Sequence, residues 1–302
     1  MLWFVCAYSN PCGYESRKRL YLEFERHIVE ELGGNLLTVE CAYGDKGFEL
    51  QQRENEGEYC GLHMYVGVRA ATHMWHKENL LNIGISRLPQ ECTKVCWCDA
   101  DIRFLSGRAA IKDICDGLEE HPVVQCFSTC IDEGPDGKAM RVHHAIALGL
   151  QCRNSKHETY DHPGYCWAAR RNFVDRIGGL LDVCAVGGGD RIMAMAFVGR
   201  AKEVLEFVGY SIGYVDHVLD WEERVYRYTG GSVGCVRGMI FHSFHGYKHD
   251  RMYNQRKAIL VKHGFCPEAH LEANEDGVYE VTCPQISADI LGYFQVRNED
   301  AR

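Results

Sequence analysis

Apolar positions near the start of the chain follow two different periods. Residues 2–8 are rich in aromatic and β-branched side chains, which predicts a buried strand. In residues 16–32 an apolar side chain recurs at every fourth position, at Leu20, Phe24, Ile28 and Leu32. This period predicts an amphipathic helix that Ser16 can cap and a glycine pair ends. Residues 36–40 predict a second strand, and the strand–helix–strand order predicts parallel pairing through a right-handed crossover.

Strands and helices continue to alternate along the chain. The pattern predicts a loop at 43–61, a strand at 62–72, a helix at 75–89 and a strand at 93–104 that ends in acids. Two β-like runs, 123–130 and 141–150, flank a turn at 132–137, and further helices are predicted at 169–178, 189–199, 214–227 and 248–262. A single α/β domain with a less regular C-terminal third is therefore expected.

Composition narrows the class of protein. With 46% hydrophobic and 25% charged residues the chain has the composition of a folded globular protein. No apolar run is long enough to cross a membrane, so we expect a cytoplasmic protein of a bacterium or of a virus-infected cell. The net charge of −9 argues against a large nucleic-acid interface. The 16 cysteines, many of them inside apolar runs, are expected to be free core residues.

The candidate chemistry begins at Asp99-Ala100-Asp101. Carboxylates at a strand end, pointing the same way, can hold Mn²⁺ or Mg²⁺. The cation can bridge the phosphates of a nucleotide-sugar and stabilise the charge of the leaving group. The simpler interpretation is a pair of acids that closes a strand and caps the next turn.

The flanking sequence supports the chemical interpretation. Residues 75–104, WHKENLLNIGISRLPQECTKVCWCDADIRF, resemble the corresponding stretch of the β-1,4-galactosyltransferase-like families. These families have the single-domain GT-A fold, a Rossmann-like nucleotide-sugar-binding domain with a mixed central sheet. The resemblance implies Lys77 near the diphosphate, Asn82 near the nucleotide, Asp101 on the metal, and Asp99 near the donor ribose or the metal.

Two later blocks extend the resemblance over roughly residues 1–260. GYCWAARRNFVDRIGGLLDVCAVGGGD, at 164–190, resembles the glycine-rich block that precedes the family's catalytic base, which implies this role for Asp190. A carboxylate there can deprotonate an attacking hydroxyl, and the glycines before it allow close approach to a sugar. Asp190 can instead cap the following helix. Met239-Ile240-Phe241-His242 resembles the Met-x-x-His block, which implies His242 as a metal ligand, with His245 as its rival.

Other positions are weaker candidates. Arg17 is assigned to the diphosphate, although the family's basic first-strand motif is replaced here by AYSNPCGYESR. Glu40 and Gly188 complete the donor-binding candidates. Trp167 and His162 are candidates for the acceptor wall, and a core tryptophan and a surface turn are the alternatives.

These assignments predict a metal-dependent glycosyltransferase. Residues 1–105 would bind the nucleotide-sugar, with a uridine diphosphate sugar as the expected donor, and residues 106–302 the acceptor. The acceptor hydroxyl can belong to a glycan, a protein, a small molecule or, as a minority hypothesis, a hydroxymethylated base in viral DNA. A nucleotidyltransferase that makes the sugar nucleotide and a non-catalytic sugar-binding module are the alternatives.

Overall fold

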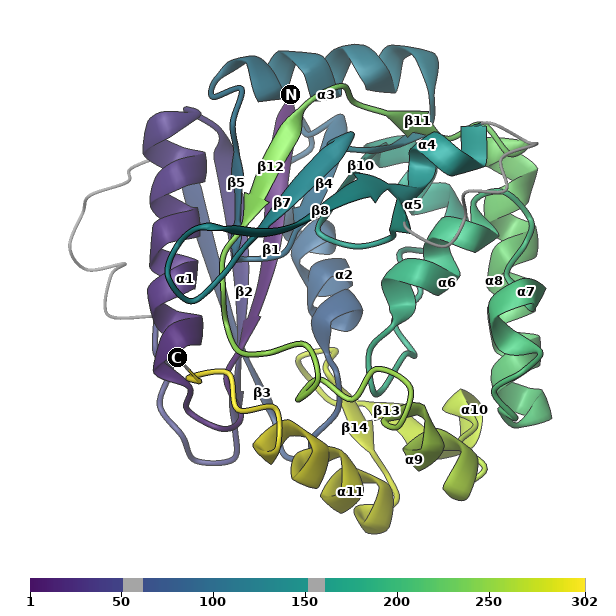
Figure 1. The fold of residues 1–302 in the computed structure, drawn as a ribbon. Coiled ribbons are helices and arrows are strands. Elements are labelled where there is room, and N and C mark those ends of the chain that lie inside the picture. Colours follow the sequence, from purple (N-terminus) through teal and green to yellow (C-terminus); the bar gives the residue numbers. More distant parts are fainter. Residues whose placement is uncertain (51–61, 152–160, 302) are drawn as a thin grey trace.

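A mixed sheet forms the centre of the computed structural model, which describes residues 1–50, 62–151 and 161–301 (Figure 1). Its strands are β1 (Leu2–Ser9), β2 (Asn35–Tyr43), β3 (His63–Ala70), β4 (Lys94–Cys98), β6 (Val123–Gln125), β10 (Cys166–Arg170) and β11 (Gly234–Cys235). They pair in the order β11-β6-β10-β4-β1-β2-β3. β1 to β4 are parallel, whereas β10 runs antiparallel to both of its neighbours. The predicted α/β class with a mixed sheet is confirmed.

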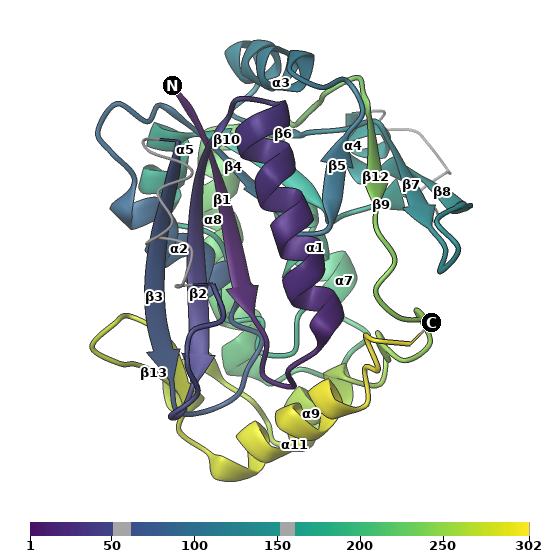
Figure 2. The same cartoon turned by 90° about the vertical axis from the view of Figure 1, so that its left-hand side faces the viewer.

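Helices cover both faces of this sheet because its strands are apolar on both sides. Along β1, Phe4 and Cys6 pack on one face, whereas Trp3 and Val5 pack on the other. The first face is covered by α1 (Glu15–Arg26), its π-helical continuation η1 (His27–Glu31) and α3 (Ala109–Glu120) (Figure 2). The second is covered by α2 (Lys77–Arg87), α5 (Arg171–Ile177), α6 (Gly189–Ala196) and α8 (Ile212–Thr229).

A smaller sheet lies beside the first. Its order is β5-β12-β7-β8-β9, with β5 at Ile102–Phe104, β12 at Met239–His242, β7 at Thr129–Glu133, β8 at Ala139–Ala145 and β9 at Asp161–His162. The remaining elements are α4 (Ile146–Gln151), α7 (Lys202–Leu205), α9 (Lys257–Lys262), α10 (Pro267–His270), α11 (Pro284–Gln295) and the hairpin of β13 (Leu271–Ala273) and β14 (Tyr279–Val281). None of the helices described is long and apolar enough to span a bilayer.

The prediction of one continuous strand at 93–104 is wrong, because the segment forms two strands in different sheets. The chain leaves the large sheet after Cys98 and enters the small one at Ile102. Asp99 and Asp101 therefore lie in the connection, not at alternate positions of one strand. Their backbones are fixed from different sides: Asp99 N–H donates to the Tyr165 carbonyl (2.8 Å), and the Asp101 carbonyl accepts from Ser243 N–H (2.8 Å).

Other boundaries differ because side chains and turns compete with the pattern. Tyr14, not Ser16, precedes the first helix, and the Ser16 hydroxyl donates to the Glu299 carbonyl. The run at 141–150 is a strand only to Ala145 and then forms α4. In the helix predicted at 248–262, turns occupy the first half, where Met252 has a positive φ of 44°. Most of the loop predicted at 43–61 lies outside the described residues, since these stop at 50 and resume at 62.

Of the fourteen cysteines within the described residues, nine are buried, as the core interpretation predicts, whereas five are half-buried, and none of the fourteen forms a disulfide. Cys96 and Cys98 on β4 and Cys166 on β10 place their sulfurs together, with Cys98 Sγ 2.9 Å from Cys166 Sγ. They meet because Cys98 and Cys166 are paired residues of antiparallel strands.

Candidate active site

A cavity of about 560 Å³ opens where β1 and β4 end. Carboxyl ends of parallel strands are the usual ligand-binding edge of an open α/β sheet. The walls are the ends of these strands, the loop before β10, the start of α6 and the segment after β12. The fifth wall is the C-terminal segment, which returns to the start of α1 (Figure 2).

Three potential metal ligands meet at this cavity, and the segments that carry them are distant in the sequence. Asp101, His242 and His245 have ligand atoms within 4.8 Å of one another. His245 Nε2 lies 3.0 Å and His242 Nε2 3.7 Å from Asp101 Oδ2, and the two Nε2 atoms are 3.3 Å apart. Asp101 Oδ1 is buried without a hydrogen-bond partner among the described residues. The group therefore combines two imidazoles with a carboxylate oxygen that lacks a partner, and we call it the metal group.

The protonation of the metal group suits metal binding. Burial would raise the pKa of Asp101, but the imidazoles of His242 and His245 hold that pKa well below its usual range. Burial, together with the Arg251 guanidinium, lowers the pKa of His245 to about 4, so this imidazole is neutral near pH 7. A neutral imidazole has a lone pair for a cation. In this structure the His245 Nε2 atom lies 2.8 Å from an Arg251 nitrogen, a contact that a bound cation would replace.

Asp132 on β7 orients one of these histidines. Its buried carboxylate lies 3.1 Å from His242 Nδ1, which leaves Nε2 to face Asp101. It also accepts from Tyr165 Oη (2.8 Å) and pairs with His143 Nε2 (2.8 Å) and Lys248. A carboxylate behind a metal-binding histidine fixes the ring and its tautomer.

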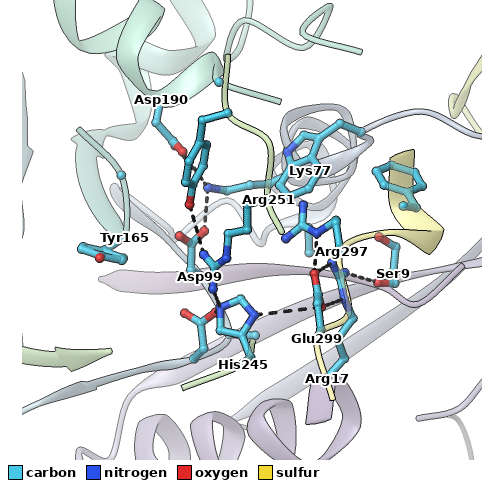
Figure 3. A pocket seen from close by; sticks show the side chains of 18 of the residues that line it. Ser9, Arg17, Lys77, Asp99, Tyr165, Asp190, His245, Arg251, Arg297 and Glu299 are labelled. Atoms are coloured by element: carbon cyan, nitrogen blue, oxygen red, sulfur yellow. Dashed lines mark hydrogen bonds and ion pairs between the residues drawn. The ribbon is translucent and has the colours of Figure 1, made fainter. Parts of the chain in front are cut away.

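Lys77 joins the two acids on the other side of the cavity. Its Nζ lies 2.6 Å from Asp99 Oδ1 and 3.1 Å from Asp190 Oδ1 (Figure 3). Burial alone would lower the pKa of Lys77, but the carboxylates of Asp190 and Asp99 raise it well above its usual value. Burial, opposed by Lys77, raises the pKa of Asp99 to about 6. Lys77 thus holds two carboxylates side by side in a partly buried site.

Asp190 reaches the cavity because glycine backbones surround it. Gly187 and Gly188 adopt left-handed conformations, with φ of 79° and 89°, and turn the chain into α6. Opposite them, a Cβ on Gly164 would lie 3.1 Å from Asp190 Oδ2. Side chains at these positions would therefore displace either the turn or the carboxylate.

Arg17 lies in the cavity wall within an ion-pair network of the C-terminal segment. Glu299 accepts from Arg17 through both oxygens, at 2.5 and 2.9 Å, and from Arg297 Nε at 2.6 Å (Figure 3). Arg17 Nη1 also donates to the Ser9 carbonyl at the end of β1 (2.6 Å). Glu299 is 1% exposed, so this carboxylate is buried between two guanidinium groups.

The structure thus brings most of the predicted site residues together. Those that line the cavity are Arg17, Lys77, Asp99, Asp101, His162, Gly188, Asp190, His242 and His245. His162 stacks on Tyr165 with ring centroids 3.8 Å apart. Asp99 turns to Lys77 and is not part of the metal group.

Three predicted residues lie away from the cavity. Glu40 accepts from the amides of Glu49 and Leu50 and from Tyr65. Asn82 on α2 holds the Leu180 backbone through both ends of its amide. Trp167 is buried against Phe197 and donates to the Pro163 carbonyl, as in the core alternative.

Sequence reasoning missed Asp132, Arg251 and Glu299. The sequence predicts Asp132 in a turn, although in the structure it occupies a buried position of β7, two residues after the buried Cys130. Glu299 stands in a short polar segment with no periodicity, so nothing local marks it.

Comparison with known proteins gives structural likeness alone. No family model matches the chain, and no curated protein matches it in sequence. Similar solved structures include GalNAc-T7 with UDP, GalNAc and Mn²⁺, at 10% identity and a TM-score of 0.48. The alignment covers 80% of this chain and 44% of that one, so this chain spans less than half of its length.

Two further structures are similar at the same level. TarS of S. aureus (residues 1–349) is 10% identical with a TM-score of 0.42, over 98% of this chain and 71% of that one. The catalytic domain of Drosophila β1,4-galactosyltransferase 7 is 12% identical with a TM-score of 0.38, over 93% and 92% of the two chains. These are glycosyltransferases of the predicted GT-A type. Sequence identities and TM-scores as low as these do not identify the donor, the acceptor or the reaction of this chain.

Proposed function

We propose that this chain is a metal-dependent glycosyltransferase that moves a sugar from a nucleoside diphosphate, with uridine diphosphate as the expected carrier, to an acceptor hydroxyl. One observation carries the proposal: a metal group and a lysine-held pair of carboxylates face the same cavity. The metal group suits the diphosphate of the donor, and Asp190 of the carboxylate pair suits the hydroxyl that attacks the sugar.

The ligands fit Mn²⁺ better than Mg²⁺. Mg²⁺ prefers oxygen ligands in octahedral geometry, whereas two imidazoles and one carboxylate suit a softer divalent ion. The unpartnered Asp101 Oδ1 and the neutral His245 give such an ion two of its contacts. When bound, the cation would supply positive charge to the leaving nucleoside diphosphate.

Asp190 is proposed as the base. As the acceptor oxygen bonds to the anomeric carbon, the bond from that carbon to the phosphate oxygen breaks, and Asp190 takes the hydroxyl proton. Lys77 positions Asp190 through the 3.1 Å contact of its Nζ with Oδ1. This single displacement inverts the anomeric configuration, and a product of retained configuration by NMR would contradict it.

The remaining cavity residues suit the donor. The end of β1, with Tyr8 and Ser9, and Arg17 on α1 line the same cavity as Asp99. Asp99 can accept from a ribose hydroxyl. Arg17 is proposed as a phosphate contact, which would require its guanidinium to exchange part of its contact with Glu299 for phosphate oxygens.

The first experiment incubates the full chain with a panel of nucleotide-sugars, with Mn²⁺ or with a chelator, and quantifies the nucleoside diphosphate released. Release from one donor that requires Mn²⁺ and is lost in Asp101→Asn is expected. The matched control is Asp220→Asn, because Asp220 is an exposed acid on α8 outside the cavity. Absence of release from every donor, with no donor-dependent rise in Tm, would refute the proposal.

Adding nucleoside triphosphates with sugar 1-phosphates to the panel, and quantifying pyrophosphate as well, separates the two alternatives. A nucleotidyltransferase would release pyrophosphate from a nucleoside triphosphate. A non-catalytic sugar-binding module would show a donor-dependent rise in Tm without release.

A further inference from the structure

Basic side chains predominate around the cavity. Among the described residues that line it, eight are Arg or Lys and four are Asp or Glu. The cavity thus carries an excess of four formal positive charges, although the whole chain has a net charge of −9. This concentration of positive charge favours an anionic ligand.

Four of these eight cations have carboxylate partners. Arg17 and Arg297 pair with Glu299, Lys77 pairs with Asp99 and Asp190, and Lys248 pairs with Asp132. Arg251 contacts His245 in the metal group. Arg191, Arg256 and Lys257 remain, and within the described part of the chain no carboxylate lies within 4.0 Å of their charged nitrogens. We call these three residues the cation cluster.

Arg256 is the buried member of the cation cluster. It is 7% exposed, and its Nε has no hydrogen-bond partner in the part of the chain described. Its guanidinium carbon lies 4.9 Å from the ring centroid of Tyr253 and 5.8 Å from those of Trp75 and Tyr293. Aromatic faces offset only part of the cost of removing a cation from water. Arg256 Nη1 donates to Tyr293 Oη (2.9 Å), but no carboxylate offsets the charge of this buried guanidinium, which favours an anionic ligand.

The three charges lie close to one another and to Asp190. Burial, with the nearby charges of Arg256 and Arg191, lowers the pKa of Lys257. A Cβ on Gly187 would lie 3.4 Å from an Arg256 nitrogen, so the glycine turn that carries Asp190 also packs on Arg256. Arg191 follows Asp190 directly. The cation cluster thus adjoins the turn that carries the proposed base.

We infer that the acceptor carries a phosphate close to the hydroxyl that is glycosylated, and that Arg191, Arg256 and Lys257 bind it. This inference rests on the proposed function, since it names the acceptor class of the same site. Guanidinium groups bind phosphate oxygens through paired N–H groups, and an ammonium adds a further donor. A phosphorylated sugar or polyol and the backbone of a nucleic acid both offer this chemistry.

The test compares acceptors that differ by one phosphate. The full chain, Mn²⁺ and the donor found by the release assay are combined with glycerol or glycerol 3-phosphate, with ribose or ribose 5-phosphate, and with a single-stranded oligonucleotide. The readout is the ratio of kcat/KM for the phosphorylated acceptor to that for the neutral one, so a general loss of activity cancels. Preference for glycerol 3-phosphate or ribose 5-phosphate would indicate a phosphorylated polyol or sugar as the acceptor, whereas preference for the oligonucleotide would indicate a nucleic acid.

The variant is Arg191→Gln/Lys257→Gln, which spares the buried Arg256. Its control is Arg87→Gln/Lys202→Gln, which removes two exposed charges outside the cavity. Because charge-assisted hydrogen bonds to the phosphate would be made, we expect kcat/KM to be roughly ten times or more higher for the phosphorylated acceptor than for the neutral one. This ratio should fall about tenfold or further in the variant and stay the same in the control. A ratio near one in the unmodified chain, or an equal ratio in the variant, would overturn the inference.

A binding measurement separates this inference from the proposed function. Titration calorimetry with inorganic phosphate, without metal or donor, is expected to show binding that the double variant weakens about tenfold or more. If no donor is turned over but phosphate binds in this way, the proposed function fails and the cation cluster stands as an anion site. Phosphate binding that is absent, or equal in the variant, would overturn the inference whether or not the donor is turned over.

Discussion

Replacing Glu78 by glutamine tests the burial of an ionisable side chain next to the turn that carries Asp190. Glu78 is 1% exposed, and its Oε2 has no hydrogen-bond partner among the described residues. It lies beneath the turn that carries Asp190, where a Cβ on Gly189 would lie 3.1 Å from Glu78 Oε1. Burial raises the pKa of Glu78 from 4.5 to about 8, against the opposing charge of Lys77.

The magnitude follows from linkage between protonation and folding. The folded pKa lies above the unfolded one, so the unfolded chain binds fewer protons between pH 4.5 and 8. The contribution of protonated Glu78 is therefore complete below pH 4.5 and is lost as the pH rises through 8. At about 1.4 kcal/mol per pH unit, the loss is about 3 kcal/mol at pH 7 and about 5 kcal/mol above pH 8.

The glutamine in Glu78→Gln cannot ionise, so this variant should not lose stability through position 78 as the pH rises. Its free energy of unfolding should therefore increase relative to that of the unmodified chain between pH 5 and pH 9. The assay is urea unfolding at pH 5, 7 and 9, from which the difference between the two proteins is taken at each pH. Glu91→Gln, which changes an exposed glutamate, is the matched control. If the difference stays constant from pH 5 to pH 9, Glu78 is not a buried acid with a raised pKa and the reasoning fails.

Three further changes test the sheet, the metal group and the base. Gly84→Ala places a Cβ 2.9 Å from side chains of β1 and β2 and should cost about 1–3 kcal/mol in urea unfolding; stability equal to that of the unmodified chain would contradict this packing. Asp132→Asn should weaken Mn²⁺ binding about 10–100-fold in titration calorimetry, because it weakens the contact that orients His242. An unchanged affinity would show that His242 needs no such support. Asp190→Asn should slow transfer by roughly 10²–10⁴ with the donor-dependent rise in Tm retained, and transfer at the normal rate would exclude Asp190 as the base.

The sequence by itself indicated the parallel part of the sheet and the first helices that pack on it, but not β10, whose last residues fall in a predicted helix. β1, β2 and α2 carry apolar runs whose period depends only on local geometry, so their existence and order could be predicted. Asp99 and Asp101 could be singled out by their spacing after an apolar run, and Asp190 by the resemblance of the block that ends with it. The glycine turn before Asp190 is also a local requirement, since its positive φ angles favour glycine.

Only the tertiary structure decided which of these residues meet. Asp132 and Glu299 act on His242 and Arg17 through pairings between segments far apart in the chain, and no local pattern records such pairings. Glu40 was also expected to bind the donor, but the amides of a neighbouring loop bind both of its oxygens. A side chain's type follows from the sequence, whereas its partners follow from packing, because burial leaves each polar group to the neighbours that the fold brings within reach.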